Sequence, residues 1–407
     1  MAYRIPPLRA GHELHLLEGA RELFPAMLAA IDGARSEVLL ETYIFDFTGE
    51  GAEIAYALER AASRGVTVRV VADAVGSGES PPAWLHRLSH AGVAWRWYSP
   101  TGWLGLMSLR QWRRLHRKLC VVDATIGFCG GINILDDFHD PNHGALDAPR
   151  FDFALRAAGP LVAEMHDTMQ QLWLRLEAAS RLRHAQLTGA LVSLRAARAR
   201  TGPGSRAAPW RAGSSRAKAA LVLRDNVRNR GRIERAYRRA IGQAREEIII
   251  ANAYFVPGRK LRHALVSAAK RGVRVSLLLQ GRYEYFMQYY AARPVLGAML
   301  HAGVEIFEYA PSFLHAKVAV VDGRWATVGS SNLDPLSLLL AREANVMVED
   351  AAFAQRLRQR LLRAMRDDGT RLDAAAYESR SGWMRAKEWL ALVVMRVALF
   401  VQGKRYL

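Results

Sequence analysis

Cysteines and long hydrophobic runs are both scarce in this sequence of 407 residues. The two cysteines, Cys120 and Cys129, lie in apolar runs, so we expect buried, reduced thiols and no disulfide framework. No stretch approaches the roughly 18 uninterrupted apolar residues of a membrane-spanning helix. The first residues do not combine a basic segment with an apolar core, so no secretory signal is expected. These features favour a protein of cytosolic origin that is soluble or lies on a membrane.

Acidic residues are few compared with basic ones. The chain has 38 Asp and Glu against 57 Lys and Arg, which gives a formal net charge of +19. Such a charge attracts polyanions, either nucleic acid or an anionic membrane surface, and by itself does not choose between them.

The most informative feature of the sequence is an internal duplication. The segments ARSEVLLETYIF and RGVTVRVVADAVG near the start return later as AREEIIIANAYFV and RGVRVSLLLQG, and HAGV follows in each half. Short apolar runs that alternate with helical patterns predict an α/β fold with helices on both faces of a largely parallel or mixed sheet. We therefore expect two similar halves, at residues 8–176 and 219–370.

Residues 177–218, between the two halves, have a different composition. From Arg175 to Lys218 there are ten basic residues against one acid, Glu177, and the later part is rich in Gly, Pro, Ser and Arg. This pattern is typical of a surface linker that is disordered, although a solvated helix fits its first part equally well. Residues 371–407 form a C-terminal tail.

Each half contains one copy of the pattern HxKxxxxD, in LHRKLCVVDATIGFCGGIN and LHAKVAVVDGRWATVGSSN. On a strand, the His and the Lys point to the same face, and the Asp then begins a tight turn. Glycines at the end of the returning strand let a phosphate approach the backbone, and Asn133 and Asn332 can donate to a phosphate oxygen. The candidate catalytic residues are His116, Lys118, Asp123, His315, Lys317 and Asp322.

Two copies suit displacement at a phosphodiester. One imidazole attacks phosphorus while the other protonates the leaving oxygen, and this requires one neutral and one protonated ring. Lys118, Lys317 and the two asparagines can offset charge on the remaining oxygens without a metal. Each half supplies one set, so we expect a single site where the halves meet.

With these motifs the sequence resembles the phospholipase D superfamily, and within it the bacterial cardiolipin synthases, most closely those of the B type. The resemblance covers residues 14–349 and is most specific in HAKVAVVDGRWATVGSSNLDPLSLLLAREANV and NAYFVPG. It implies a pseudo-twofold pair of α/β sandwich halves with the active site at their interface, and no metal or other cofactor. It also implies a phosphohistidine on His116, with His315 as acid and then base. A carboxylate downstream of each motif orients the imidazole, and the matching residues are Asp152 and Glu343.

The resemblance also implies the reaction and the partners. The expected enzyme is a phosphatidyltransferase that joins two phosphatidylglycerol molecules into cardiolipin and releases glycerol. Anionic lipids are the expected partners, not nucleic acid, and the expected location is the cytoplasmic side of the bacterial inner membrane, as a peripheral protein. A phospholipase D hydrolase, or a phosphodiesterase acting on nucleic acid, is the alternative, because the same two motifs serve all of these reactions.

Three segments bear on lipid contact. TGWLGLMSLRQWRR, at residues 101–114, suits a headgroup boundary or a packed helix, and RYEYFMQYY, at residues 282–290, suits an acyl route or the core. Residues 389–401 contain one polar residue, Arg396, and suit a helix in one leaflet or a buried contact.

Overall fold

The computed structural model describes residues 5–78, 80–99, 113–141, 143–184, 186–199, 217–225, 229–282, 286–334, 341–379 and 381–401. Two compact units make up the chain. We call Leu8–Asp136 with Ala154–Leu221 the first unit, and Met1–Pro7, Asp137–Phe153 and Val222–Leu407 the second unit. The segment Asp137–Phe153 lies in the second unit although the sequence predicts that residues 8–176 form one continuous half. Its place follows from a parallel bridge between Phe151 and Leu314.

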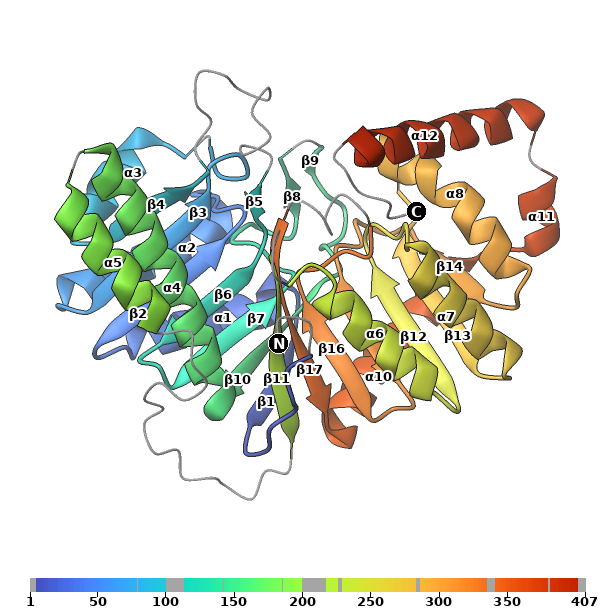
Figure 1. Cartoon of the computed structure of the whole chain (residues 1–407), viewed down its shortest axis with the longest axis horizontal. Helices are drawn as coiled ribbons and strands as arrows, with labels where there is room; N and C mark the ends of the chain where they lie inside the picture. The colour runs from blue at the N-terminus through green and yellow to red at the C-terminus, as the bar shows by residue number, and fades with distance from the viewer. Residues whose placement is uncertain are drawn as a thin grey trace. The chain divides into compact units, whose positions relative to one another are not determined.

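The first unit is built on a mixed sheet in the order β1-β10-β7-β6-β2-β3-β4 (Figure 1). Its strands are β1 (Glu13–Glu18), β2 (Glu37–Thr42), β3 (Thr67–Asp73), β4 (Ala94–Tyr98), β6 (Lys118–Val122), β7 (Ile126–Gly130) and β10 (Phe153–Ala158), and the two-residue β5 (Arg114–Leu115) precedes the first motif. The central strand β2 runs parallel to β3 and antiparallel to β6, with Leu40 opposite Cys120. Buried β-branched and aliphatic side chains on both faces explain the continuous apolar runs in the sequence.

Helices cover both faces of this sheet. They are α1 (Gly19–Asp32), α2 (Gly49–Ser63), α3 (Pro82–His90), α4 (Pro160–Arg183) and α5 (Leu187–Ala199). Phe24 of α1 and Leu58 of α2 belong to the core with Leu40 and Cys120, whereas Trp173 of α4 packs with Val71 on the opposite face. Since α5 is helical and packs on α4, the helical alternative holds for the first part of the predicted linker. Residues 200–216 lie outside the described residues, as do residues 101–112 of the predicted headgroup loop.

The second unit repeats the same plan. Its sheet has the order β11-β17-β16-β15-β12-β13-β14-β18, formed by β11 (Lys218–Arg224), β12 (Glu247–Asn252), β13 (Arg274–Gln280), β14 (Glu305–Tyr309), β15 (Lys317–Val321), β16 (Trp325–Gly329), β17 (Ala341–Glu349) and β18 (Gly369–Arg371). Replacing each strand of the first sheet by its copy gives the same order, to which β18 adds one strand beside β14, so the duplication is confirmed in the fold. A small hairpin, β8 (His139–Asp140) and β9 (Gly144–Ala145), completes this unit.

The helices of the second unit are α6 (Arg232–Gln243), α7 (Arg259–Lys270), α8 (Phe286–Leu300), α10 (Ala351–Asp367), α11 (Ala374–Glu378) and α12 (Gly382–Val401). α10 packs along most of the sheet, and α12 packs on α8 (Figure 1). Ala391 and Leu392 are buried, but Trp383, Trp389 and Leu390 are 72%, 62% and 59% exposed. The C-terminal helix therefore has both a packed face and an exposed apolar one. Within the described residues, no helix has the length and apolar character needed to cross a bilayer.

Candidate active site

The first His-x-Lys pair lies where β6 begins. Lys118 is the first residue of the strand and is 6% exposed, and His116 stands two positions before it, partly exposed. The ammonium of Lys118 donates to the backbone carbonyl of His116 at 2.9 Å. This hydrogen bond holds the charged group beside its own histidine, as the alternation of side chains along a strand predicts.

The second pair has the same geometry at the start of β15. Lys317 begins the strand and is fully buried, and its ammonium donates to the carbonyl of His315. The two copies therefore agree in local structure as well as in sequence.

The aspartate of each motif lies at the other end of its strand. Asp123 and Asp322 both have a φ of 49°, and each begins the tight turn that the sequence predicts. Asp123 accepts hydrogen bonds from three successive backbone N–H groups, residues 35–37, and Asp322 does the same with residues 245–247, all at 2.8–2.9 Å. Each carboxylate thereby fastens its hairpin to the start of the neighbouring central strand.

The charge of these two carboxylates is stabilised in place. Burial alone raises the pKa of Asp123 and of Asp322, but the backbone hydrogen bonds outweigh it and bring both below the usual 3.8. A separation of seven residues along a strand puts each Asp about 20 Å from its motif histidine. These contacts anchor the two hairpins, and the catalytic role that the sequence predicts for both residues stays a prediction.

Asp152 contacts the histidine of the second motif. Its Oδ2 lies 2.7 Å from Nδ1 of His315 and 4.0 Å from the ammonium of Lys317, and its Oδ1 accepts from the Phe153 N–H at 2.7 Å. The resemblance assigned Asp152 to the imidazole of the motif that precedes it in sequence. The structure corrects this, because Phe151 and His315 are joined by a backbone hydrogen bond of 2.9 Å that brings the two segments together. With Nδ1 donating to the carboxylate, chemistry at this ring falls to Nε2.

Glu343 lies on β17 in the second unit and is fully buried. It accepts from the hydroxyl of Ser330 and lies 3.6 Å from the guanidinium of Arg224, which is also fully buried. These partners fix the carboxylate inside the unit. Its predicted part in orienting a histidine stays a prediction.

The two predicted phosphate-binding asparagines follow the returning strands. Asn133 accepts from the Ile44 N–H at 3.2 Å through its carbonyl oxygen, which leaves its NH₂ group as the donor side. Asn332 is 2% exposed, and its Oδ1 has no hydrogen-bond partner among the described residues. Since an amide oxygen only accepts, contact with a phosphate would fall to the NH₂ group of each asparagine, and this role stays a prediction.

Sequence reasoning missed two polar residues that hold the backbone just before each motif. Asp73 ends β3, is fully buried and accepts from the Leu115 N–H at 2.7 Å. Gln280 ends β13 and accepts from the Leu314 N–H at 3.3 Å. Burial raises the pKa of Asp73, and its backbone hydrogen bonds offset this only in part. The signal was present in the sequence, since both residues are polar at the end of a buried apolar strand and occupy the same place in the repeat.

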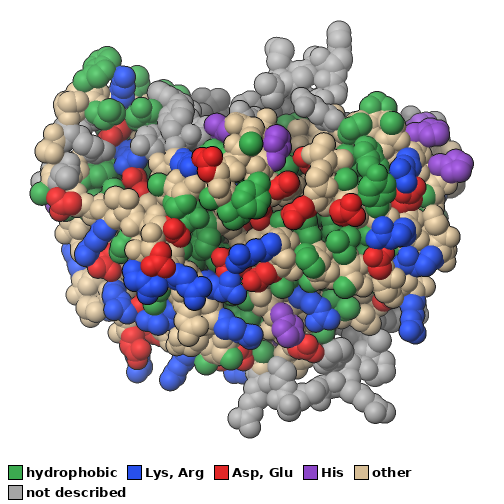
Figure 2. Space-filling model, turned by 180° about the vertical axis from the view of Figure 1, so that it is seen from behind, with side chains coloured by type: hydrophobic (Ala, Val, Ile, Leu, Met, Phe, Trp, Pro, Cys, Tyr) green, Lys and Arg blue, Asp and Glu red, His purple; other side chains and the backbone are tan. Residues whose placement is uncertain are grey.

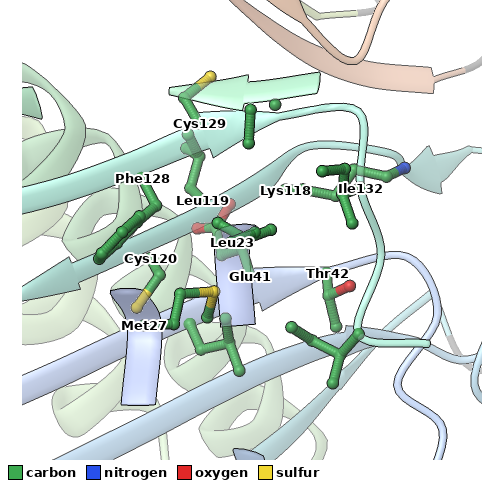
Figure 3. A pocket seen from close by; sticks show the side chains of 14 residues that line it. Leu23, Met27, Glu41, Thr42, Lys118, Leu119, Cys120, Phe128, Cys129 and Ile132 are labelled. Carbon is green, nitrogen blue, oxygen red and sulfur yellow. The ribbon is translucent and has the colours of Figure 1, made fainter. Parts of the chain in front are cut away.

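A small cavity lies behind Lys118, between α1 and the first sheet (Figure 3). It is lined by Leu23 and Met27 of α1 together with Cys120 and Phe128 of the sheet. Its volume of about 20 Å³ is room for about one water molecule. A phospholipid does not fit there, so the cavity is a packing void near the motif.

Within the described residues, no group of three or more His, Cys, Asp or Glu side chains is placed to hold a metal ion. Beside each motif histidine the structure places a lysine ammonium group, that of Lys118 or of Lys317.

Comparisons with known proteins agree with this arrangement. A profile of the family described as "Cardiolipin synthase, PLD-like domain" matches residues 27–146 and 237–365. These two ranges contain the two motifs, both asparagines and Glu343.

The chain is also similar to two curated proteins over most of its length. It is 38% identical to cardiolipin synthase B of Escherichia coli K12 over 388 residues, which are 95% of this chain and 89% of that protein. It is 31% identical to cardiolipin synthase A of Pseudomonas fluorescens, with coverage of 97% and 75%.

Among solved structures, the phosphatidylserine synthase of Haemophilus influenzae superposes with a TM-score of 0.67 at 14% identity. The match covers 98% of this chain and 97% of that one. At this identity the likeness concerns the fold alone, and it confirms the predicted class of two α/β halves.

Proposed function

Since the chain belongs to the cardiolipin synthase family of phospholipase D-like proteins, we propose that it is a phosphatidyltransferase that makes cardiolipin from two phosphatidylglycerol molecules. The observation that carries this proposal is the 38% identity to cardiolipin synthase B over 95% of the chain. The presence of His, Lys and Asn in both motifs supports it, because these are the side chains that the proposed reaction uses.

The reaction proceeds in two displacements at one phosphorus. Nε2 of His116 attacks the phosphorus of the first lipid, the bond to the glycerol oxygen breaks, and protonated His315 gives its proton to that oxygen. The hydroxyl of the second phosphatidylglycerol then loses its proton to His315, its oxygen bonds to phosphorus, and the bond from phosphorus to His116 breaks. Cardiolipin and glycerol are the products, and both histidines return to their starting state.

The contact between Asp152 and His315 supports this division of roles. A carboxylate on Nδ1 holds one tautomer and offsets the positive charge of the ring when Nε2 carries a proton, which is what an acid and then a base requires. Lys118 and Lys317, each fixed beside its histidine, supply positive charge for the phosphoryl oxygens.

Phospholipid substrates place the enzyme at a membrane, and we propose peripheral attachment on the cytoplasmic side of the bacterial inner membrane. Two features support it. The exposed apolar face of α12, with Trp383, Trp389 and Leu390, is followed by Lys404 and Arg405 in the sequence. Lys and Arg side chains are spread widely over the face shown in Figure 2, as expected from the net charge of +19, and basic groups favour anionic lipid.

The test is mass spectrometry of lipids after incubation of the pure protein with phosphatidylglycerol vesicles. We expect cardiolipin as the main product and little phosphatidic acid. The variants His116→Ala and His315→Ala should each lose nearly all activity, and the double variant should be little worse, because residues that act as a unit are not additive. Dominant phosphatidic acid would favour hydrolysis instead. Cleavage of single-stranded DNA by the wild type but not by these variants would favour the nuclease alternative.

A further inference from the structure

The two halves differ at one position beside the motifs. Asp123 and Asp322 bind the N–H groups of Glu37 and Glu247, which fixes these two glutamates as equivalent. Six residues further along, the first half has Tyr43 where the second half has Ala253. The fold therefore does not need an aromatic side chain here, and the ring in the first half requires another explanation.

Tyr43 contacts both reactive groups of the first motif. Its ring centroid lies 5.1 Å from that of His116, with the planes tilted by 53°, and the ammonium of Lys118 lies 5.4 Å from the same centroid. The first distance is that of a packed aromatic pair, and the second that of a cation over a π-face. A ring in this place restricts the imidazole and covers part of it.

The surrounding loop holds Tyr43 in this position. The hydroxyl of Ser77 donates to the Tyr43 carbonyl at 2.9 Å. A Cβ at Gly76 would lie 2.3 Å from that carbonyl oxygen and 3.0 Å from the Tyr43 ring, so only glycine fits under the tyrosine. Asp73 accepts from the N–H groups of Val75 and Gly76 as well as from the backbone before His116. One buried carboxylate thus fixes both the loop beneath the ring and the backbone just before the histidine.

We propose that Tyr43 is a positioning residue of the first motif, which sets the plane of the His116 imidazole and so orients the phosphohistidine toward a lipid acceptor rather than water. The proposal rests on the proposed function, in which His116 carries the phosphatidyl group. That intermediate has two fates. Attack by a lipid hydroxyl forms cardiolipin. Attack by water forms phosphatidic acid, because the water oxygen bonds to phosphorus as the bond from phosphorus to His116 breaks. A ring that holds the imidazole favours the first outcome, because it keeps the bond from phosphorus to Nε2 in line with the bound lipid hydroxyl, whereas the small water molecule can also attack a phosphoryl group that is less well oriented.

The test compares Tyr43→Ala and Tyr43→Phe with the wild type on phosphatidylglycerol vesicles in ¹⁸O-labelled water. Two quantities are measured: kcat for cardiolipin, and the fraction of product that is labelled phosphatidic acid. The contacts are made by the ring, so Tyr43→Phe should stay within about twofold of the wild type in both. Tyr43→Ala should lower kcat about tenfold, the scale of one aromatic contact, and raise the labelled fraction several-fold.

Tyr56→Ala is the matched control. Tyr56 lies on α2 and packs on Trp84 with a centroid distance of 4.8 Å, within the first unit and without a role in the motif. This variant should lose some stability but keep the product ratio of the wild type. Gly76→Ala tests the same ring in a second way, because the added methyl group must displace Tyr43. Cooperative melting of the purified variant shows that it folds, and the folded variant should have a raised fraction of labelled phosphatidic acid.

The outcomes separate the two ideas. A wild type that makes no cardiolipin overturns the proposed function. A wild type that makes cardiolipin, together with Tyr43→Ala and Gly76→Ala variants that fold and keep its product ratio, overturns only the role of Tyr43. A raised phosphatidic acid fraction in Tyr43→Ala but not in Tyr56→Ala supports it.

Discussion

The buried ion pair between Arg117 and Glu41 permits a sharp test of what holds the first motif in place. Nε of Arg117 lies 2.7 Å from Oε2 of Glu41, and the two side chains are only 5% and 1% exposed. Arg117 stands between His116 and Lys118 and so points to the opposite face of the strand. The equivalent positions in the second half are Ala316 and Ala251, so the same fold also exists without the pair.

Removing one partner leaves the other charge buried, and this costs about 3–5 kcal/mol. For a unit of this size, each kcal/mol lowers the melting temperature by roughly 2–4 °C, so Arg117→Ala or Glu41→Ala should lower it by roughly 6–20 °C. The double variant removes both charges and reproduces the alanines of the second half. It should therefore be more stable than either single variant.

The assay is thermal unfolding of the four proteins by circular dichroism at pH 7. Arg60→Ala serves as the control, because it breaks a pair with Asp32 at 2.8 Å whose side chains are 49% and 42% exposed. An exposed pair contributes at most about 1 kcal/mol, so this variant should melt within a few degrees of the wild type. A double variant whose loss equals the sum of the single losses would refute the coupling between the two buried charges.

Four further outcomes are expected. Asp123→Asn should lower the melting temperature at pH 7, as should Asp322→Asn. The folded-state pKa of each aspartate lies below its usual 3.8, so the stability that its charge adds is present above that value and is lost as the pH falls through the folded pKa. In melting curves from pH 7 to pH 3, the difference in melting temperature between each variant and the wild type should therefore become smaller below about pH 4. Asp152→Asn should lower kcat about a hundredfold or more in the vesicle assay, and an unchanged kcat would remove Asp152 from the acid–base role. The melting temperature should also fall, because the buried ammonium of Lys317 loses the carboxylate beside it. Chelator should not change cardiolipin yield, since lysines supply the positive charge at the motifs, and loss of yield would point to a required metal. In a flotation assay with anionic vesicles, high salt should release a truncation that ends at Ser381 but should release the full chain only partly. The reason is that burial of the apolar face of α12 in the membrane does not depend on salt. Equal release of both proteins would show that this face contacts protein instead of lipid.

Much of the fold could be predicted because short stretches of the sequence determine its strands and turns. The strand, tight turn and returning strand of each motif follow from β-branched runs around Asp-Ala and Asp-Gly. The structure gives Ala124 a φ of 52°, close to the 58° of Gly323. The first turn thus keeps its shape although an alanine occupies a left-handed position that favours glycine. Local sequence was sufficient to predict these turns, although the hydrogen bonds from residues 35–37 and 245–247 that hold the two aspartates come from distant parts of the chain.

Contacts between distant residues could not be predicted in the same way. The hydrogen bond between Asp152 and His315 joins residues 163 positions apart, and no periodicity in the sequence encodes such a pairing. Similarly, the composition of residues 187–199 gave no basis for choosing between a linker and the helix α5, which is stabilised by packing on α4. Tertiary packing decided both cases.

The partner of Asp152 also bears on why the chain keeps two copies of the motif. Asp152 follows the first motif in sequence, yet it belongs to the second unit and holds the second histidine. A fragment with residues 222–407 alone would retain His315 and Lys317 but lose the carboxylate on Nδ1. A change at residue 152 therefore alters the hydrogen bonding of a histidine that lies 163 positions later in the chain. The two repeats in the sequence are therefore not two independent half-sites. Asp152, which follows the first motif in the sequence, forms the hydrogen bond to Nδ1 of His315 in the second motif.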